Sequence, residues 1–340
     1  MIVRSKAPLR LGLAGGGTDV SPYPDRFGGA VLNATISMYA YASIIPRNDG
    51  KIVIHSVDRQ ELFESDSVGF ITPDGVLDLH KGIYNRIYRD FTREKMAFEL
   101  TTYVDAPPGS GLGSSSTLVT AIIGAFSEWL KLPLGDYDTA NLAYEIERLD
   151  LGFAGGKQDQ YAATFGGVNF MEFYEANKVI VNPLRIRTEI LNELSHNLLL
   201  YYTGSSRLSS TIIHTQQESL KNNRMDSVEA MHKTKEMAVL IKEAILKSEL
   251  DQVGLLLDDA WQFKKRMAEG ISNPFFDAIY DSAKKAGALG GKISGAGGGG
   301  YMFFYCPENS RFGVTEALKK FKGVVTPFQF TKTGLNTWTI

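Results

Sequence analysis

The chain is poor in the features that mark secreted proteins. Its 340 residues include one cysteine, Cys306, so no disulfide can form within the chain. The N-terminal stretch has no long apolar core of the kind found in secretory signals. Cys306 follows the apolar run YMFFY and is expected at a buried strand end rather than as a nucleophile. These absences predict a protein of the reducing cytoplasm.

Long apolar runs and an excess of one charge are also lacking. No stretch approaches the roughly 18 consecutive apolar residues that cross a bilayer. The 36 basic and 38 acidic residues leave a formal net charge of −2, and the basic residues are spread along the chain. A nucleic-acid surface would need clustered positive charge. We therefore expect no membrane and no nucleic acid among the partners.

Histidine is scarce and scattered, which argues against two classes of enzyme. The chain has five histidines and neither an HExxH motif nor a Cys partner for them, so a zinc centre is not expected. The GxSxG motif of Ser-His-Asp hydrolases is absent as well. The five histidines are His55, His80, His196, His214 and His232.

Glycine, in contrast, is concentrated in three segments. These are PLRLGLAGGGTD at 8–19, PPGSGLGSSST at 107–117 and GGKISGAGGGGYMFF at 290–304. Their spacing has no period, so they do not indicate a repeat protein. We expect them to converge around one ligand.

The segment 107–117 is the most informative of the three. Gly109, Gly111 and Gly113 permit positive φ and leave no Cβ between an anion and the backbone amides. An amphipathic helix follows, and its N-terminus attracts negative charge. The segment has neither the Walker A ending nor the GxGxxG pattern. It predicts a phosphate cradle, and the alternative is an ordinary Gly-Ser turn with Ser114 as the helix N-cap.

Hydrophobic periodicity predicts an α+β protein with a domain boundary near residue 180. We expect domains at 1–180 and 181–340, the second with a ferredoxin-like alternation of helices and strands. The helical stretch 226–269 either contains a homodimer surface or covers a sheet. Strands are predicted at 31–45, 51–56, 168–174 and 301–306 and around 324–330 and 335–340. Helices are predicted at 114–131, 138–150, 209–223, 226–248, 250–269, 274–287 and 310–322.

The three glycine-rich segments, in this order, resemble the three motifs of the GHMP kinase superfamily. That superfamily includes galactokinase, homoserine kinase, mevalonate kinase and phosphomevalonate kinase. GGGTD, the following GGAVLNATI, and YTGSSR at 202–207 resemble sugar kinases that act on D-glycero-D-manno-heptose 7-phosphate, with the L-fucokinase domain as a close relative. The resemblance implies an N-terminal domain like ribosomal protein S5 domain 2 and a ferredoxin-like C-terminal domain.

The resemblance also implies a reaction. ATP and Mg²⁺ would serve to phosphorylate the anomeric hydroxyl of the heptose 7-phosphate, giving the 1,7-bisphosphate and ADP. L-fucose or another unphosphorylated sugar is the alternative acceptor. A nucleotide-binding regulator without catalysis is a second alternative, against which the joint presence of Arg10, Glu147 and Asp159 argues.

The resemblance assigns roles to residues of the first two motifs and of GGKQDQYAATFGG. Asp159 would orient the attacking hydroxyl and accept its proton late, since a carboxylate is a weak base at neutral pH. Arg10 would keep Asp159 ionised or stabilise charge on the phosphoryl group, although Leu9 stands where the pattern has glycine. The residues expected at the ATP phosphates are Pro108, Gly109, Ser110, Gly111, Leu112, Gly113, Ser114, Ser115 and Ser116.

Ser115 and Glu147 are the predicted magnesium ligands. Glu147 lies 12 residues before Asp159, the spacing of the galactokinase pattern, at the edge of the apolar stripe of its helix. Mg²⁺ needs few protein oxygens beside the phosphates. Ser114 remains an alternative to Ser115, and Glu145 and Asp150 remain alternatives to Glu147.

Asp19 matches the aspartate that binds sugar hydroxyls in galactokinase. Gly16 and Gly17 replace the bulky Glu and His of that pattern and leave room for a larger or phosphorylated sugar. The resemblance places Thr18 and Gly297 in the same substrate site. For a phosphate on the sugar, Arg207 is the favoured partner, with Lys157 and Arg26 as further candidates.

Overall fold

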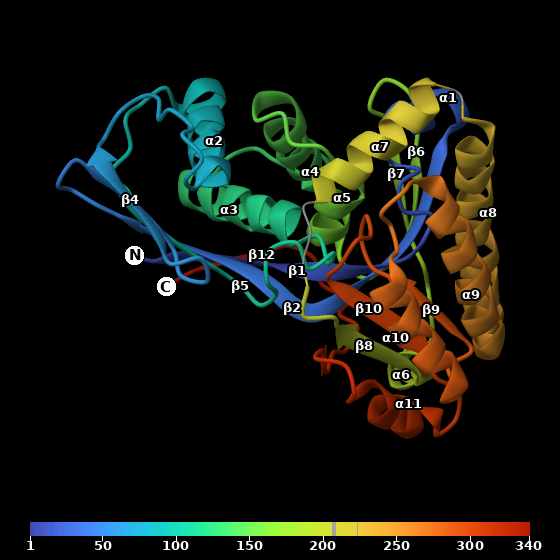
Figure 1. Ribbon diagram of the computed structural model, residues 1–340. Helices are drawn as coiled ribbons and strands as arrows, with labels where there is room; N and C mark the ends of the chain where they lie inside the picture. Colours follow the sequence, from blue (N-terminus) through green and yellow to red (C-terminus); the bar gives the residue numbers. More distant parts are fainter. Residues whose placement is uncertain (206–208, 223) are drawn as a thin grey trace.

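The computed structural model describes residues 1–205, 209–222 and 224–340. Two sheets make up its framework (Figure 1). A large, curved sheet carries helices on one face, and a smaller sheet with its own helices lies beside one end of it. Helices and strands are both abundant in each half, which confirms the prediction of an α+β protein.

The larger sheet runs in the order β12-β1-β2-β5-β3-β4, with β6 and β7 attached to β2. Its neighbouring strands are antiparallel except for β3 and β5, which are parallel. Its strands in the described ranges are β1 (Val3–Ala14), β2 (Gly29–Pro46), β3 (Lys51–Ser56), β4 (Glu61–Asp66), β5 (Phe98–Val104), β6 (Val168–Phe173), β7 (Val179–Pro183) and β12 (Asn336–Thr339).

Strand β2 is the longest strand of this sheet, and it pairs with three others. It is 18 residues long, and it pairs with β6 near its start and with β5 near its end. Its first eight residues are buried on both faces, whereas residues 37–46 alternate between buried and less buried positions. That alternation is what a sheet with one solvated face requires. The strand predicted at 31–45 is therefore confirmed.

Helices from the first half of the chain cover one face of the larger sheet (Figure 1). The longest, α3, has an almost continuously buried stretch from Ser116 to Phe126. Phe126 packs edge-on against Phe98 of β5, with ring centroids 5.3 Å apart. These helices are α1 (Tyr23–Phe27), α2 (Asp78–Ile87), α3 (Ser114–Leu130), α4 (Asp136–Glu145) and α5 (Gln158–Phe165).

The helix predicted at 138–150 is not a uniform α-helix. It ends as α4 at Glu145 and continues as one π-helical turn over Ile146–Asp150. The amide of Leu151 donates to the carbonyl of Ile146, which is the wider i→i+5 bond of a π turn. Glu147 lies in this turn and is fully buried.

The smaller sheet is formed in the second half of the chain, in the order β11-β8-β10-β9. Its strands are β8 (Leu198–Tyr202), β9 (Gly290–Ile293), β10 (Tyr301–Tyr305) and β11 (Val324–Val325). The helices of this half in the described ranges are α6 (Thr188–Asn197), α7 (Ser209–Lys221), α8 (Met225–Lys247), α9 (Leu250–Met267), α10 (Pro274–Lys285) and α11 (Ser310–Leu318).

The long helices α8 and α9 pack against each other and connect the two sheets. Helix α8 lies on β1 and β2 of the larger sheet, and α9 lies on β9 and β10 of the smaller one. The helical stretch 226–269 therefore covers both sheets. Within the described residues, no helix combines the length and the apolar character that crossing a bilayer demands.

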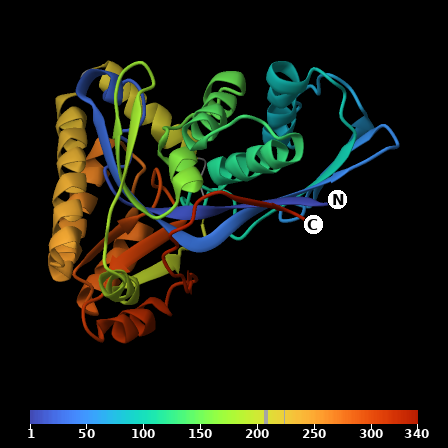
Figure 2. The same ribbon diagram turned by 180° about the vertical axis from the view of Figure 1, so that it is seen from behind.

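The last strand returns to the larger sheet. β12 pairs with β1, with Val3 opposite Thr339, so the end of the second half completes the sheet that the first half began. Figure 2 shows this C-terminal segment running back from the smaller sheet along the larger one. The domain boundary near residue 180 stays a prediction. Residues 336–339 belong to the second predicted domain by sequence, but they lie in the sheet formed mainly by the first.

We predict that Phe126→Ala lowers the free energy of unfolding by about 3–5 kcal/mol, because it leaves a cavity among fully buried aromatic rings. Urea denaturation followed by circular dichroism measures this. Phe312→Ala is the matched control, since Phe312 is 64% exposed, and we expect a change within about 0.5 kcal/mol there. Equal effects of the two substitutions would contradict the packing described for Phe126.

Candidate active site

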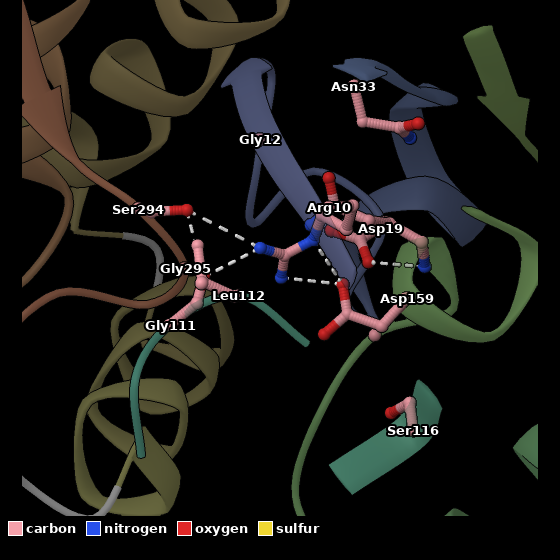
Figure 3. Close-up of polar contacts among 12 residues, drawn as sticks. Arg10, Gly12, Asp19, Asn33, Gly111, Leu112, Ser116, Asp159, Ser294 and Gly295 are labelled. Carbon is pink, nitrogen blue, oxygen red and sulfur yellow. Dashed lines mark hydrogen bonds and ion pairs between the residues drawn. The ribbon is translucent and has the colours of Figure 1, made fainter. Parts of the chain in front are cut away.

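Arg10, on β1, joins all three glycine-rich segments (Figure 3). Its Nε donates to Oδ1 of Asp159 at 2.7 Å, and its Nη2 lies 2.6 Å from the same oxygen. Nη1 donates to the carbonyl of Gly111 at 2.7 Å and lies 3.5 Å from Oγ of Ser294. The guanidinium is only 3% exposed. A buried guanidinium holds this geometry because each of its contacts is to an oxygen that needs a donor.

The loop 107–113 packs directly on the third glycine-rich segment. Gly111 has φ +78°, and a Cβ on it would lie 2.4 Å from the carbonyl oxygen of Ser294. A Cβ on Gly300 would lie 2.2 Å from the carbonyl oxygen of Ser110. Only glycine permits both the backbone conformation and the close approach at these positions. The two loops therefore form one wall, which the hydroxyl of Ser294 closes with a 2.9 Å hydrogen bond to Gly111.

Helix α3 begins where this loop ends. Gly113, with φ +79°, occupies the N-cap, and no side chain caps the helix. The alternative with Ser114 as N-cap is therefore wrong, because α3 already includes Ser114. Amides of a first turn without a side-chain cap, next to a loop of glycines, suit an anion.

Ser115 and Glu147 face each other at the start of α3. The hydroxyl of Ser115 donates to Oε1 of Glu147 at 2.9 Å. The side-chain amide of Gln160 donates to the other carboxylate oxygen at 2.5 Å, and Arg148 lies 3.6 Å from Oε1. The rival carboxylates Glu145 and Asp150 instead pair with Arg86. Of the three carboxylates, Glu147 is therefore the one that contacts the start of α3.

Asp19 is held at the turn of GGGTD by backbone amides. Gly17 donates to one of its carboxylate oxygens at 3.1 Å, and Gln158 of α5 donates to the other, also at 3.1 Å. Gly156 makes room for this carboxylate, because a Cβ there would lie 1.9 Å from Oδ2. The bond from Gln158 thus ties Asp19 to the first turn of α5, which also carries Asp159.

Two buried lysines reinforce the same region. Lys292 of β9 donates to the carbonyl of Gly12 at 2.6 Å, and Lys264 of α9 donates to the carbonyl of Gly295. Burial, and then the charge of Arg10, lower the pKa of Lys264 to about 8. Burial, together with Lys264 and Arg10, holds the pKa of Lys292 well below its ordinary value. Arg10, Lys264 and Lys292 thus lie close enough together for their charges to repel one another.

These groups surround a cavity of about 430 Å³. The predicted residues that line it come from the first two glycine-rich segments and from the regions of Glu147 and Asp159, and they are Arg10, Gly16, Gly17, Asp19, Gly109, Gly111, Gly113, Ser114, Ser115, Ser116, Glu147 and Asp159. The structure therefore brings together the residues assigned to phosphate, metal, sugar and proton transfer. Their individual roles stay predictions.

Several predicted residues lie elsewhere. Thr18 is buried and its hydroxyl donates to the carbonyls of Gly15 and Ala30. It therefore stabilises the turn of GGGTD and does not line the cavity. Lys157 is buried with its amine 5.3 Å from the ring centroid of Tyr144. Pro108, Ser110, Leu112, Gly297 and Arg26 are also not among the residues that line the cavity. Arg207 lies outside the described residues.

The cavity also has wall residues that the sequence analysis did not single out. Gln158, Arg148 and Gly295 were detectable, because each lies within three residues of a predicted site residue or inside a glycine-rich segment. Lys264 carried no such signal, since it is one of two adjacent lysines on an amphipathic helix. Its buried amine donates to the carbonyl of Gly295, a contact between distant parts of the chain.

Chemically, the arrangement suits group transfer between an anion and a hydroxyl. Uncapped helix amides and positive side chains can hold a polyanion, and the Ser115–Glu147 pair can share a cation with it. Asp159, fixed by Arg10 at the side of that anion site, can accept a hydrogen bond or a proton from a hydroxyl.

Comparison with known proteins agrees with this geometry. The family model described as the N-terminal domain of GHMP kinases matches residues 78–167, and the one described as GHMP kinases C terminal matches residues 241–323. D-glycero-alpha-D-manno-heptose 7-phosphate kinase of Campylobacter jejuni is 49% identical over 338 residues, which cover 99% of both chains.

Two further relatives extend the comparison. The crystal structure of a D-glycero-D-manno-heptose 1-phosphate kinase from Bacteroides thetaiotaomicron has a TM-score of 0.85 at 46% identity and covers 99% of both chains. L-fucokinase/L-fucose-1-P guanylyltransferase of Bacteroides fragilis is 29% identical over 90% of this chain and 35% of its own length. The fold expected from the sequence resemblance is confirmed.

The pKa of Lys264 leads to a stability prediction. Unfolded Lys264 keeps its proton up to its ordinary value near 10.5, whereas the folded protein releases it near pH 8. The unfolded state therefore binds more protons between these values, so raising the pH favours folding. We expect the free energy of unfolding of the native chain, relative to Lys264→Met, to rise by roughly 1 kcal/mol per pH unit from pH 8 to 10. Urea titrations of both proteins at each pH measure the difference, and a flat difference would contradict the burial of a titrating amine.

Proposed function

The chain belongs to the GHMP kinases, and on that premise we propose that it phosphorylates D-glycero-D-manno-heptose 7-phosphate at the anomeric hydroxyl. The γ-phosphoryl group comes from ATP, and the products are the 1,7-bisphosphate and ADP. The observation that carries the proposal is the buried Arg10, which fixes Asp159 beside the glycine loop and the N-terminus of α3. The full-length similarity to the Campylobacter jejuni heptose 7-phosphate kinase supports the choice of sugar.

The donor phosphates bind in the cradle formed by residues 109–116. Backbone amides of the loop and of the first turn of α3 provide hydrogen-bond donors, and no side chain competes for the N-terminus of the helix. Arg10 and Lys264 add positive charge at the side of the cavity that the third glycine-rich segment closes. In a water-poor cavity such charges stabilise the transferring phosphoryl group more strongly than in water.

The acceptor hydroxyl attacks the γ-phosphorus while the bond from that phosphorus to the bridging oxygen of ADP breaks. The hydroxyl proton passes to a carboxylate oxygen of Asp159 as the new bond forms. Arg10 occupies Oδ1 of Asp159, so the other oxygen remains available to the hydroxyl. Orientation is thus the main contribution of Asp159, and proton acceptance follows late in the transfer.

Ser115 and Glu147 fit a magnesium ion that is shared with the donor phosphates. The fit rests on a fully buried carboxylate in contact with a hydroxyl at the start of α3. Within the described residues no group of three or more acidic, histidine or cysteine side chains could hold a metal alone. A site with two protein ligands that relies on substrate phosphates is typical of Mg²⁺. When bound, the ion neutralises charge on the β- and γ-phosphates.

In this proposal Asp19 accepts hydrogen bonds from sugar hydroxyls; its position in the lining of the cavity, beside Gly16 and Gly17, supports that role. Arg207 remains the sequence-based candidate for the phosphate on the sugar. Lys264 and Arg148 are cations that line the described part of the cavity.

A cytoplasmic location fits an enzyme that uses ATP, and a homodimer through α8 and α9 stays a prediction.

The deciding experiment is ADP production with Mg-ATP across a panel of acceptors. The panel contains the heptose 7-phosphate, the heptose 1-phosphate, the free heptose, L-fucose and galactose, because the names of the two heptose kinase relatives differ in the carbon that bears the phosphate. We expect turnover with the 7-phosphate at a kcat/KM at least tenfold above every other acceptor. Preference for a free sugar would contradict the substrate, and ATP binding without turnover on the whole panel would favour the regulator.

Asp159→Asn should reduce kcat by roughly 10²–10⁴-fold, because the amide can neither accept the proton nor pair with Arg10 as a carboxylate does. The Kd of an ATP analogue, measured by calorimetry, should change less than threefold. Asp281→Asn, on the exposed face of α10, is the matched control and should leave kcat unchanged. A kcat of Asp159→Asn within threefold of the native value would remove Asp159 from the mechanism.

A further inference from the structure

A second cavity, of about 1150 Å³, lies apart from the candidate active site. The two cavities share no lining residue. The second one is formed where three segments meet: the turn after α5 at 165–168, residues 183–188 leading into α6, and residues 328–332 between β11 and β12. The last of these belongs to the C-terminal segment that crosses from the smaller to the larger sheet in Figure 2.

The charge of this cavity is of one sign. Arg185, Arg187, Arg311 and Lys332 line it, and no aspartate or glutamate is among its lining residues. The whole chain, in contrast, has a formal net charge of −2. Clustered cations around a concave surface of low dielectric produce a local positive potential that attracts anions.

Most of this charge has no acidic partner in the described parts of the chain. Arg187 lies 3.4 Å from Glu189, whereas Arg185, Arg311 and Lys332 take part in no ion pair there. Arg311 is also fixed in place. Its Nη1 donates to the carbonyls of His196 and Leu198 at 2.7 and 2.8 Å, which orients the guanidinium beside the cavity. A preoriented guanidinium loses little freedom when it binds an oxyanion.

The floor of the cavity is apolar. Leu184, Leu191 and Val168 line it, together with the aromatic rings of Phe165 and Phe330. Both rings are only partly buried, so each offers surface to a bound molecule. Aromatic surface next to clustered cations is complementary to a ligand that has a flat apolar part and an anionic part.

We propose that this cavity is a second ligand site, which binds an organic phosphate that carries a flat apolar group. The phosphate contacts Arg185 and Lys332, Arg311 adds positive charge to the same cavity, and the apolar group packs against Phe165 and Phe330. The volume is sufficient for a molecule of nucleotide size.

The site is connected to the catalytic residues through α5. Asp159 lies in the first turn of this eight-residue helix, and Phe165 and Gly166 at its other end line the second cavity. The two ends are about 12 Å apart. The amide of Gly167 donates to Oγ1 of Thr35 at 2.7 Å, and the hydroxyl of Thr35 donates to the carbonyl of Thr331 at 2.9 Å. Because the end of α5 is hydrogen-bonded into these walls, a ligand bound between them acts on the helix that carries Asp159.

The test of binding uses 1-naphthyl phosphate, with Mg²⁺ and a nonhydrolysable ATP analogue present to fill the active site. Calorimetry should show saturable binding to the native chain. Arg185→Glu/Lys332→Glu should weaken it at least tenfold. Arg4→Glu/Lys95→Glu, a double reversal of exposed cations that line neither cavity, should change it less than twofold. Thermal melting checks that both variants are folded. Absence of binding, or equal binding to both variants, would overturn the site.

Two further measurements test the details. Inorganic phosphate should bind at least tenfold more weakly than 1-naphthyl phosphate, and equal affinity would overturn the role of the aromatic floor.

At saturating ATP and sugar, 1-naphthyl phosphate should change kcat of the native chain and leave kcat of Arg185→Glu/Lys332→Glu unchanged. An effect that persists in the variant, or no effect on the native chain, would overturn the connection through α5.

Discussion

The site depends on one guanidinium that the solvent scarcely reaches. Arg10 extends from β1 and bonds to Asp159 of α5. It also bonds to the carbonyl of Gly111, in the loop before α3, and to the hydroxyl of Ser294, which follows β9. These partners lie far apart in sequence, and one of them, Ser294, directly follows a strand of the smaller sheet. Since the guanidinium stays charged and its donors have fixed directions, it sets the positions of all three. The smaller sheet is thereby held against the larger one at the same point where the chemistry takes place.

This arrangement constrains the backbone around it. The loop at 107–113 and the segment at 294–300 approach so closely that a Cβ at Gly111 or Gly300 would overlap carbonyl groups of the other segment. The glycines thus serve two purposes, since they expose amides to an anion and allow two loops from different sheets to touch. Lys264 and Lys292 satisfy carbonyls in the same layer and are buried for that reason.

Much of the site could be predicted because motif residues carry it. The glycines, Arg10, Asp19, Glu147 and Asp159 are recognisable by type and spacing, and the structure gathers them around one cavity. Other features depend on packing between distant elements. Periodicity treats 138–150 as one helix and cannot reveal the π turn that contains the buried Glu147. Nor can it distinguish buried Lys264 from its neighbour Lys265, or show that Arg185 and Lys332 share a cavity.

The pairing of β12 with β1 has a consequence for synthesis of the protein. β1 is made before the other strands of the larger sheet, yet β12, its partner on the outer edge along residues 3–6, is made after all of them. Until then the backbone amides and carbonyls of that edge are open to other chains, which is the usual route to misassociation during translation. A nascent chain stalled before residue 336 should thus be more dependent on chaperones than its nearly complete core would suggest.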